Sequence, residues 1–177
     1  MNKLFWIVPA ILLMSITARA QEQVTPGWEI SGGYSYLKAN LGGSSFHLNG
    51  VEASATQNLN NWFGGRLEVS AFHGAEAGQT VSAQTFTYGP VFSYRRIRTI
   101  TPFAKVQLGA VHASAGYLGI SANALKFAMV GGGGVDVRVS KMASVRLQGD
   151  YLMTRFLGSN QNNIQGTAAL VLRFGKK

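Results

Sequence analysis

The chain has 177 residues, enough for one domain, and it carries a formal net charge of +9 without any cysteine. The absence of cysteine excludes disulfide frameworks, thiolate catalysis and cysteine-ligated zinc sites. The basic balance raises nucleic acid as a partner, but only 13% of the residues are charged while 46% are hydrophobic, too sparse a charge for a phosphate-binding surface.

Residues 1–20 are predicted to be a cleavable secretory signal peptide. A short basic start with Lys3 precedes an apolar run over residues 4–16, and the sequence Ala-Arg-Ala at residues 18–20 matches a cleavage site. The apolar run is shorter than the about 20 residues that span a bilayer. An uncleaved N-terminal anchor is the alternative. We expect a mature domain over residues 21–177, which keeps 14 basic and 7 acidic residues and a net charge of +7.

Residues 21–177 alternate between apolar and polar or small side chains, which is typical of β-strands, and they show no sustained helical spacing of apolar residues. In the stretch from Leu48 to Val51 the apolar positions change phase, which we interpret as a β-bulge at Asn49 and Gly50. The predicted strands, in chain order, are residues 28–36, 45–58, 62–73, 84–95, 102–114, 126–140, 144–155 and 164–174.

The connections are short, so neighbouring strands are expected to be antiparallel. Eight such strands close into an up-and-down barrel. The barrel is either soluble, with its apolar face inside, or embedded in a membrane, with its apolar face toward lipid and a polar lumen. The polar face of the strands carries five acids and five bases among small residues, which favours ion pairs in a narrow lumen. These predicted lumen residues are Glu29, Glu52, Arg66, Glu68, Lys105, Asp136, Arg138, Arg146, Asp150 and Arg173.

Aromatic residues near both ends of the strands predict two girdles at the interfaces of a bilayer. The girdle residues are Trp28, Trp62, Phe63, Tyr94, Phe103 and Phe174 at one rim and Tyr36, Phe46, Phe86 and Phe127 at the other. The alternative is a soluble barrel with scattered aromatics. The predicted fold class is therefore all-β, an eight-stranded antiparallel up-and-down transmembrane β-barrel.

The signal sequence, the alternation and the closing segment AALVLRF at residues 168–174 resemble the small outer-membrane β-barrel family that includes the transmembrane domain of OmpA and the OmpX-like proteins. The resemblance implies the outer membrane of a Gram-negative bacterium, contact with outer-membrane lipid and lipopolysaccharide, and insertion by the barrel-assembly machinery. Family members typically end in an aromatic residue, whereas here Phe174 is followed by Gly175-Lys176-Lys177.

The family includes structural proteins, narrow channels, adhesins and lipid-modifying enzymes, so its fold does not determine one function. We expect a monomeric, non-enzymatic protein with a structural or narrow porin-like role, because the interior of eight strands holds only side chains. We expect no nucleic acid, no cofactor and no metal. Candidate gate residues are Glu52, Glu68, Arg66, Lys105 and Arg138. The alternative is a surface-interaction protein or adhesin that uses outer loops near residues 39–45, 74–84, 117–125 and 158–163.

A third possibility is an enzyme. Similar eight-stranded lipid A deacylases use a His-x-Ser pair facing the lipid and an acid on the next strand, and this chain has His112-Ala113-Ser114. The acid of the next strand, Asp136, is predicted to face the lumen near the opposite end. Because a serine hydrolase needs a third group to orient its histidine, we expect no catalytic site.

Two further predictions concern other residues. Lys38 and Arg155 are expected to point outward at the outer rim, where they either contact lipopolysaccharide phosphates or remain solvated. The four glycines at residues 131–134 lack the Lys-Ser/Thr of a phosphate loop. We interpret them as a place where the strand bends or where a lumen side chain from a neighbouring strand fits.

Overall fold

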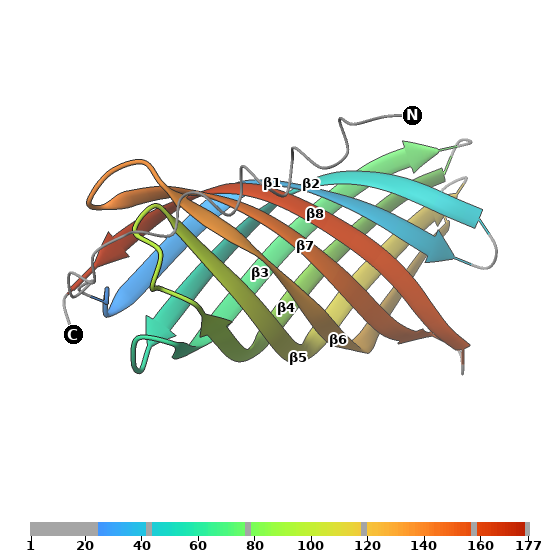
Figure 1. The fold of residues 1–177 in the computed structure, drawn as a ribbon. Coiled ribbons are helices and arrows are strands. Elements are labelled where there is room, and N and C mark those ends of the chain that lie inside the picture. Colours follow the sequence, from blue (N-terminus) through green and yellow to red (C-terminus); the bar gives the residue numbers. More distant parts are fainter. Residues whose placement is uncertain (1–24, 42–43, 77–78, 118–119, 157–158, 176–177) are drawn as a thin grey trace, which may run out of the picture.

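A computed structural model describes residues 25–41, 44–76, 79–117, 120–156 and 159–175. Eight antiparallel strands close into one barrel in chain order, and β8 pairs with β1 (Figure 1). The strands are β1 (Trp28–Leu41), β2 (Ser44–Asn58), β3 (Phe63–Glu76), β4 (Gln79–Ser93), β5 (Ile100–Tyr117), β6 (Ile120–Arg138), β7 (Ala143–Phe156) and β8 (Ser159–Phe174). The predicted signal peptide lies outside the described residues. Among the residues described, no helix is long and apolar enough to cross a membrane.

The predicted fold class is confirmed, and the eight strands begin or end close to their predicted positions at one end of the barrel. We call this the terminal end, because β1 starts and β8 finishes there, and we call the other the hairpin end. At the hairpin end the strands are longer than predicted: β1 continues to Leu41 and β8 starts at Ser159. The described parts of the expected outer loops are therefore mostly strand. Backbone pairing continues there without the apolar alternation that marks the lipid-facing part.

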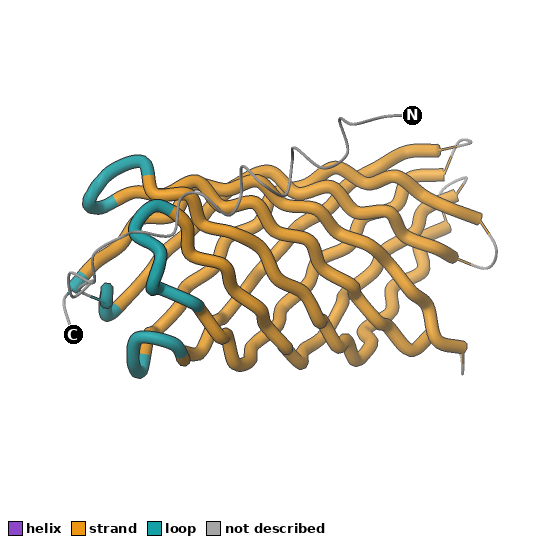
Figure 2. Tube along the Cα trace, viewed as in Figure 1, coloured by secondary structure: helices purple, strands orange, loops and turns teal. Residues whose placement is uncertain are grey.

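The strands are strongly tilted, as Figures 1 and 2 show. The paired residues Leu172, Ile30, Ala55, Leu67, Tyr88, Leu108, Met129, Met153 and Asn162 make one circuit of the barrel. The circuit returns to β8 at Asn162, ten residues from its start at Leu172. A shift of this size over eight strands corresponds to a tilt of about 40°. Each step from one strand to the next therefore rises by about 1.25 residues toward the hairpin end.

Side chains alternate between the lumen and the outer surface along every strand. On β1, Ser31 and Ser35 are buried while Ile30 and Tyr34 are exposed, so the apolar face of the strand is the outer one, as predicted. The large exposed hydrophobic residues of the other strands also lie on this outer face. The barrel therefore has the arrangement of a membrane protein, with an apolar exterior around a largely polar interior.

The predicted β-bulge at Asn49 and Gly50 is wrong. β2 pairs with β1 and with β3 through both residues without interruption. Leu48 is 2% exposed and points inward, whereas Val51 is 64% exposed and points outward. The change of phase in the sequence arises because apolar residues fill the interior on one side of this position and cover the exterior on the other.

Leu48 belongs to an apolar cluster inside the barrel, toward the hairpin end. The cluster, which we call the apolar layer, consists of Leu37, Ala39, Leu48, Phe72, Val81, Ala83, Val111, Ala128, Val130 and Leu152, with Phe46 and Ala113 packed against it. The seven strands β1 to β7 contribute to it, while on β8 the buried polar residue Asn163 pairs with Leu152 of the layer. The buried charged side chains that the structure describes lie between this layer and the terminal end.

Candidate functional site

The lumen near the terminal end contains arginines gathered around two acids. Glu29 Oε1 lies 2.8 Å from Arg95 Nη2, and Glu29 Oε2 lies 3.3 Å from Arg146 Nη2. Arg146 also donates two hydrogen bonds to Asp136, from Nε at 2.7 Å and from Nη2 at 2.8 Å. Arg173 Nε lies 4.0 Å from Glu29 Oε1. All of these side chains are buried, so each charge depends on its partners. We call this group, with Arg66, the basic layer.

Phe103 was predicted to lie on the outer surface, in the aromatic girdle that includes Trp28 and Phe174, and this prediction is wrong. The ring is 7% exposed and lies inside the lumen, between the guanidinium groups of Arg66 and Arg146. The guanidinium carbons lie 4.6 and 4.9 Å from the ring centroid, within the range of cation–π contacts. Phe103 faces inward because it has the same parity along β5 as Thr101 and Lys105, which are also buried.

Arg95 is a buried base of the lumen that the predicted set of lumen residues lacks. Its side chain is 9% exposed, pairs with Glu29 and donates a hydrogen bond of 3.0 Å to Asn58 Oδ1. The inward alternation of β4 continues past its last residue, Ser93, so that Arg95 takes the next inward position. Arg95 therefore adds a base to the five acids and five bases that were predicted for the lumen.

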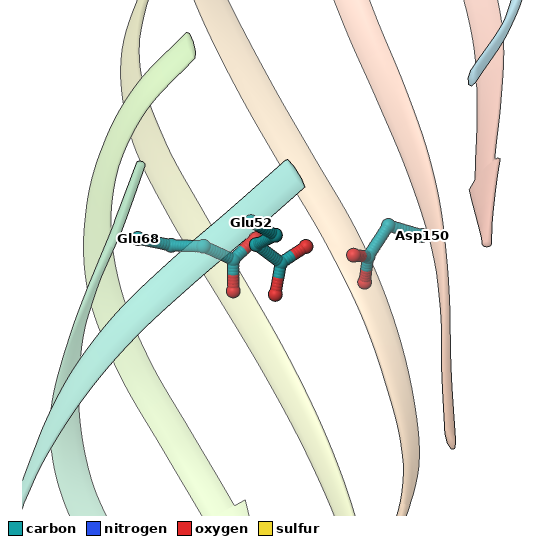
Figure 3. A group of neighbouring side chains, drawn as sticks. All are labelled: Glu52, Glu68 and Asp150. Carbon is teal, nitrogen blue, oxygen red and sulfur yellow. The ribbon is translucent and has the colours of Figure 1, made fainter. Parts of the chain in front are cut away.

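Three carboxylates meet in the middle of the lumen. Glu52, Glu68 and Asp150 come from β2, β3 and β7, and their side chains point toward one another (Figure 3). One oxygen of each lies within 4.8 Å of the others. Lys105 Nζ lies 2.6 Å from Glu68 Oε2 and 3.1 Å from Asp150 Oδ2. Carboxylate oxygens are ligands of hard divalent cations, but here the ammonium group of the chain already contacts two of the three. We call these four residues the acidic layer.

Neutral side chains hold the third carboxylate and link the two charged layers. Glu52 Oε2 accepts hydrogen bonds from Gln165 Nε2 at 2.8 Å and from Thr167 Oγ1 at 2.9 Å. Gln148 Nε2 donates to Asp150 Oδ2 at 2.7 Å, while Gln148 Oε1 accepts a bond of 3.3 Å from Arg66. The sequence analysis missed these three neutral residues, although their inward parity on β7 and β8 is a signal that could have identified them.

The ten predicted lumen residues therefore all take inward positions, but they are not evenly mixed. Glu52 pairs with Gly33, four residues beyond Glu29 along β1, so the acidic layer lies nearer the hairpin end than the basic layer does. The acidic layer has three acids and one base. The basic layer has two acids and four arginines, and half-buried Arg138 is near the same opening. From hairpin end to terminal end, the interior is apolar, then net negative, then net positive.

The four glycines of β6 make room for this arrangement. A Cβ atom on Gly132 would lie 2.0 Å from Asp150 Oδ1, and one on Gly134 would lie 2.1 Å from the backbone oxygen of Leu147. In contrast, a Cβ atom on Gly131 would meet nothing within 4 Å. The interpretation that a lumen side chain from a neighbouring strand fits here therefore agrees with the position of Asp150.

The predicted girdles are present on the outer surface except for two residues. Trp28, Trp62, Tyr94 and Phe174 are exposed at the terminal end, where Phe63 and Trp62 pack against Phe92, with ring centroids 5.4 and 6.0 Å apart. Tyr36, Phe86 and Phe127 are exposed toward the hairpin end. Phe103 lies in the lumen, as described above. Phe46 also points inward and packs against the apolar layer, because it has the same parity as Leu48 on β2.

His112 and Ser114 point outward on β5. The imidazole Nε2 and the hydroxyl oxygen lie 3.5 Å apart. Across the neighbouring strands, the residues that pair with His112 are Gln84 of β4 and Leu125 of β6. Asp136, the acid of the next strand, is buried in the lumen as part of the basic layer. Lys38 is exposed on the outer surface, while the side chain of Arg155 lies outside the described part of the chain.

Comparisons with known proteins address the family and the fold. A family model described as "Outer membrane protein beta-barrel domain" matches residues 8–174. No curated protein matches. The structure is similar to that of Neisserial surface protein A (NspA), with 13% identity, coverage of 86% of this chain and 100% of that one, and a TM-score of 0.74. It is also similar to Ail of Yersinia pestis, with 17% identity, coverage of 84% and 100% and a TM-score of 0.58. OprG from Pseudomonas aeruginosa is 11% identical, with coverage of 86% and 97% and a TM-score of 0.56.

Proposed function

The chain belongs to the outer membrane protein β-barrel domain family, and from this premise we propose that it is a structural, non-enzymatic barrel of a Gram-negative outer membrane whose lumen is closed to ions. The observation that carries the proposal is the filling of the lumen. The large polar side chains Arg66, Lys105 and Arg146 are each 1% exposed, and the apolar layer lies on their hairpin side. An ion would have to displace both paired charges and hydrocarbon in order to pass.

The apolar layer argues against a porin-like role more strongly than the charges do. If water entered, the predicted gate residues Glu52, Glu68, Arg66, Lys105 and Arg138 could exchange partners and offer polar ligands to an ion. The leucine, valine, alanine and phenylalanine side chains that make up most of the interior at this level give an ion no such ligands, so an ion that passes them loses hydration without compensation. We therefore propose that the role of the charged layers is to hold the barrel closed and rigid.

Planar-bilayer recordings test this proposal. The wild-type protein is expected to show no channel steps, and the double variant Leu48→Ser/Leu152→Ser, which makes the apolar layer polar, is expected to conduct. The matched control is Leu147→Ser, which changes the same residue type on the lipid-facing side, where Leu147 is 53% exposed. Regular channel steps in the wild-type protein would contradict the proposal. Heat-modifiable migration in gels verifies that each variant is a folded barrel.

We propose that His112 and Ser114 are not catalytic, because the acids that the structure describes all lie in the lumen. An acyl-chain hydrolysis assay on lipopolysaccharide tests this. The expected result is no turnover by the wild-type protein. Turnover that is abolished by the variant Ser114→Ala would instead show that the protein is an enzyme of the lipid A deacylase type.

A surface-interaction role is the second candidate, and one observation favours it. β5 and β6 have 18 and 19 residues, beyond the about 9–11 that cross a bilayer, so their hairpin extends past the apolar band. The structurally similar Ail is named as the attachment invasion locus protein of Yersinia pestis. Binding of whole cells to host surfaces, compared with cells that lack the protein, tests this role. Equal binding by both would exclude it.

A further inference from the structure

The outer surface toward the hairpin end carries a group of residues that the proposed function does not use. The chain has three histidines in all, and each of them, His47, His73 and His112, is exposed on the outer face of the barrel. Lys38 is exposed on the same face. The residues come from β2, β3, β5 and β1. We call this group the histidine belt.

The four residues lie at one level, although their strands are tilted. The strand pairings that connect them are Lys38 with His47, Asn49 with His73, His73 with Ser82, and Gln84 with His112. Each step from one strand to the next rises by about 1.25 residues toward the hairpin end. The moves from His47 to Asn49 along β2 and from Ser82 to Gln84 along β4 each go two residues back toward the terminal end. The four positions therefore stay within about 1.5 residues of one another, or about 4 Å along the barrel axis.

This level matches one face of a bilayer. On β1, Lys38 lies ten residues beyond Trp28, which belongs to the aromatic girdle of the terminal end. Ten residues in a strand tilted by about 40° rise about 25 Å, which is the height of the apolar band of an outer-membrane barrel. The histidine belt therefore lies where the headgroups of the opposite leaflet begin, while Tyr36 and Phe86 lie just below it.

No described acid faces the belt. The five acidic side chains that the structure describes, Glu29, Glu52, Glu68, Asp136 and Asp150, are all buried in the lumen. The histidines instead contact neutral groups: His47 the Tyr36 hydroxyl, His73 the Ser82 hydroxyl at 3.0 Å and His112 the Ser114 hydroxyl at 3.5 Å. Gln84, Asn49 and Leu125 are the other facing neighbours, so Lys38 and Tyr36 are the charged and titratable groups around the imidazoles.

A belt with cationic groups and no described counter-charge of its own fits an anionic partner. We propose that the histidine belt binds the phosphate groups of the outer-leaflet glycolipid, lipopolysaccharide, and that it does so more tightly at acidic pH. Each imidazole that gains a proton adds a positive charge and an N–H donor for a phosphate oxygen. The belt charge rises from about +1, on Lys38 alone, to about +4 when all three imidazoles are protonated.

This inference rests on the proposed function, a barrel of the outer membrane, and on the expectation from the sequence that the loops at the hairpin end are the outer ones. It goes beyond it by naming the lipid, the residues that hold it and the condition that strengthens the contact. The glycolipid is favoured because its phosphates lie at the top of the apolar band, at the level of the belt. The strands β1 to β5 present the belt along one continuous side of the barrel, which suits a ligand with two phosphates on a broad headgroup.

Native mass spectrometry of the full barrel with lipid A tests the inference. The wild-type protein is expected to retain at least about tenfold more lipid A at pH 5.5 than at pH 7.5. The triple variant His47→Gln/His73→Gln/His112→Gln is expected to lose this pH dependence, and Lys38→Gln to reduce binding at both pH values. The control Lys141→Gln removes an exposed charge from the turn at the terminal end and should leave binding unchanged.

Two further arms identify what is bound. Lipid A without its phosphates is expected not to bind, and phosphatidylglycerol vesicles are expected to bind more weakly than lipid A. Equal retention at both pH values, by the triple variant and wild type alike, would overturn the inference, as would equal retention of dephosphorylated lipid A. Equal binding of phosphatidylglycerol would overturn the choice of glycolipid. Heat-modifiable migration and silent bilayer recordings would persist in each case, so the proposed function stands or fails separately.

Discussion

Replacing Arg146 by methionine is expected to destabilise the barrel more than any substitution of similar size on its outer surface. Arg146 donates to both carboxylate oxygens of Asp136, at 2.7 and 2.8 Å, and to Glu29 at 3.3 Å. It also lies over the ring of Phe103. Glu29 keeps Arg95 at 2.8 Å, so the main loss falls on Asp136.

The magnitude follows from the burial of Asp136. Removing one partner of a buried ion pair typically costs about 3–5 kcal/mol, because the remaining charge stays desolvated without compensation. The lost contact with Phe103 adds about 0.5–2 kcal/mol. Arg146→Met is therefore expected to lower the free energy of unfolding by about 3.5–7 kcal/mol. The double variant Arg146→Met/Asp136→Leu removes both charges and is expected to recover most of this loss.

Urea unfolding from phospholipid vesicles, followed by tryptophan fluorescence, measures these free energies. Trp28 and Trp62 are exposed on the outer surface at the terminal end, so their emission reports transfer from lipid to water. A loss of less than about 1 kcal/mol in Arg146→Met would refute the reasoning, because the pair would then be no stronger than an exposed one. A double variant less stable than Arg146→Met would refute the assignment of the cost to the stranded carboxylate.

Three further predictions use the same unfolding assay. Leu48→Ala is expected to cost about 2–5 kcal/mol through a cavity in the apolar layer, whereas Leu147→Ala on the lipid face should cost clearly less; equal costs would argue against a packed layer. Gly132→Ala is expected to cost about 1–3 kcal/mol because its Cβ would clash with a lumen carboxylate, while Gly131→Ala, with nothing within 4 Å, should be nearly neutral. Phe103→Leu is expected to cost about 1–3 kcal/mol by removing the ring between two guanidinium groups, and an unchanged midpoint would show that the cation–π contacts contribute little.

The inward or outward alternation along each strand is enough to assign much of the lumen. It also places inward the two aromatic residues whose predicted girdle positions are wrong. Phe103 alternates in step with Lys105, and Phe46 with Leu48, although the positions of both aromatics near strand ends favour a place in the girdles. Arg95 follows the same alternation past the end of β4. Residue type is a weaker guide than alternation here, because in a strand the direction of each Cβ is set by the backbone.

The order of the apolar, acidic and basic layers along the barrel axis could not be predicted from the alternation. Whether Glu52 meets Asp150 or Asp136 depends on how far β2 and β7 are displaced along each other, and these strands are not neighbours in the sheet. That displacement is the accumulated register of the strands between them. The shift of ten residues over the circuit follows from all eight pairings together, so a local pattern in one strand does not determine it.

The sequence by itself therefore determined the number of strands, their antiparallel order, the apolar exterior and most of the inward charges, because alternation is a local property of an extended backbone. Only the tertiary structure separated the interior into apolar, acidic and basic layers and brought Lys38 and three distant histidines to one level. Both results depend on register and tilt, which place residues from different strands at the same height. Those quantities exist only once the barrel has closed.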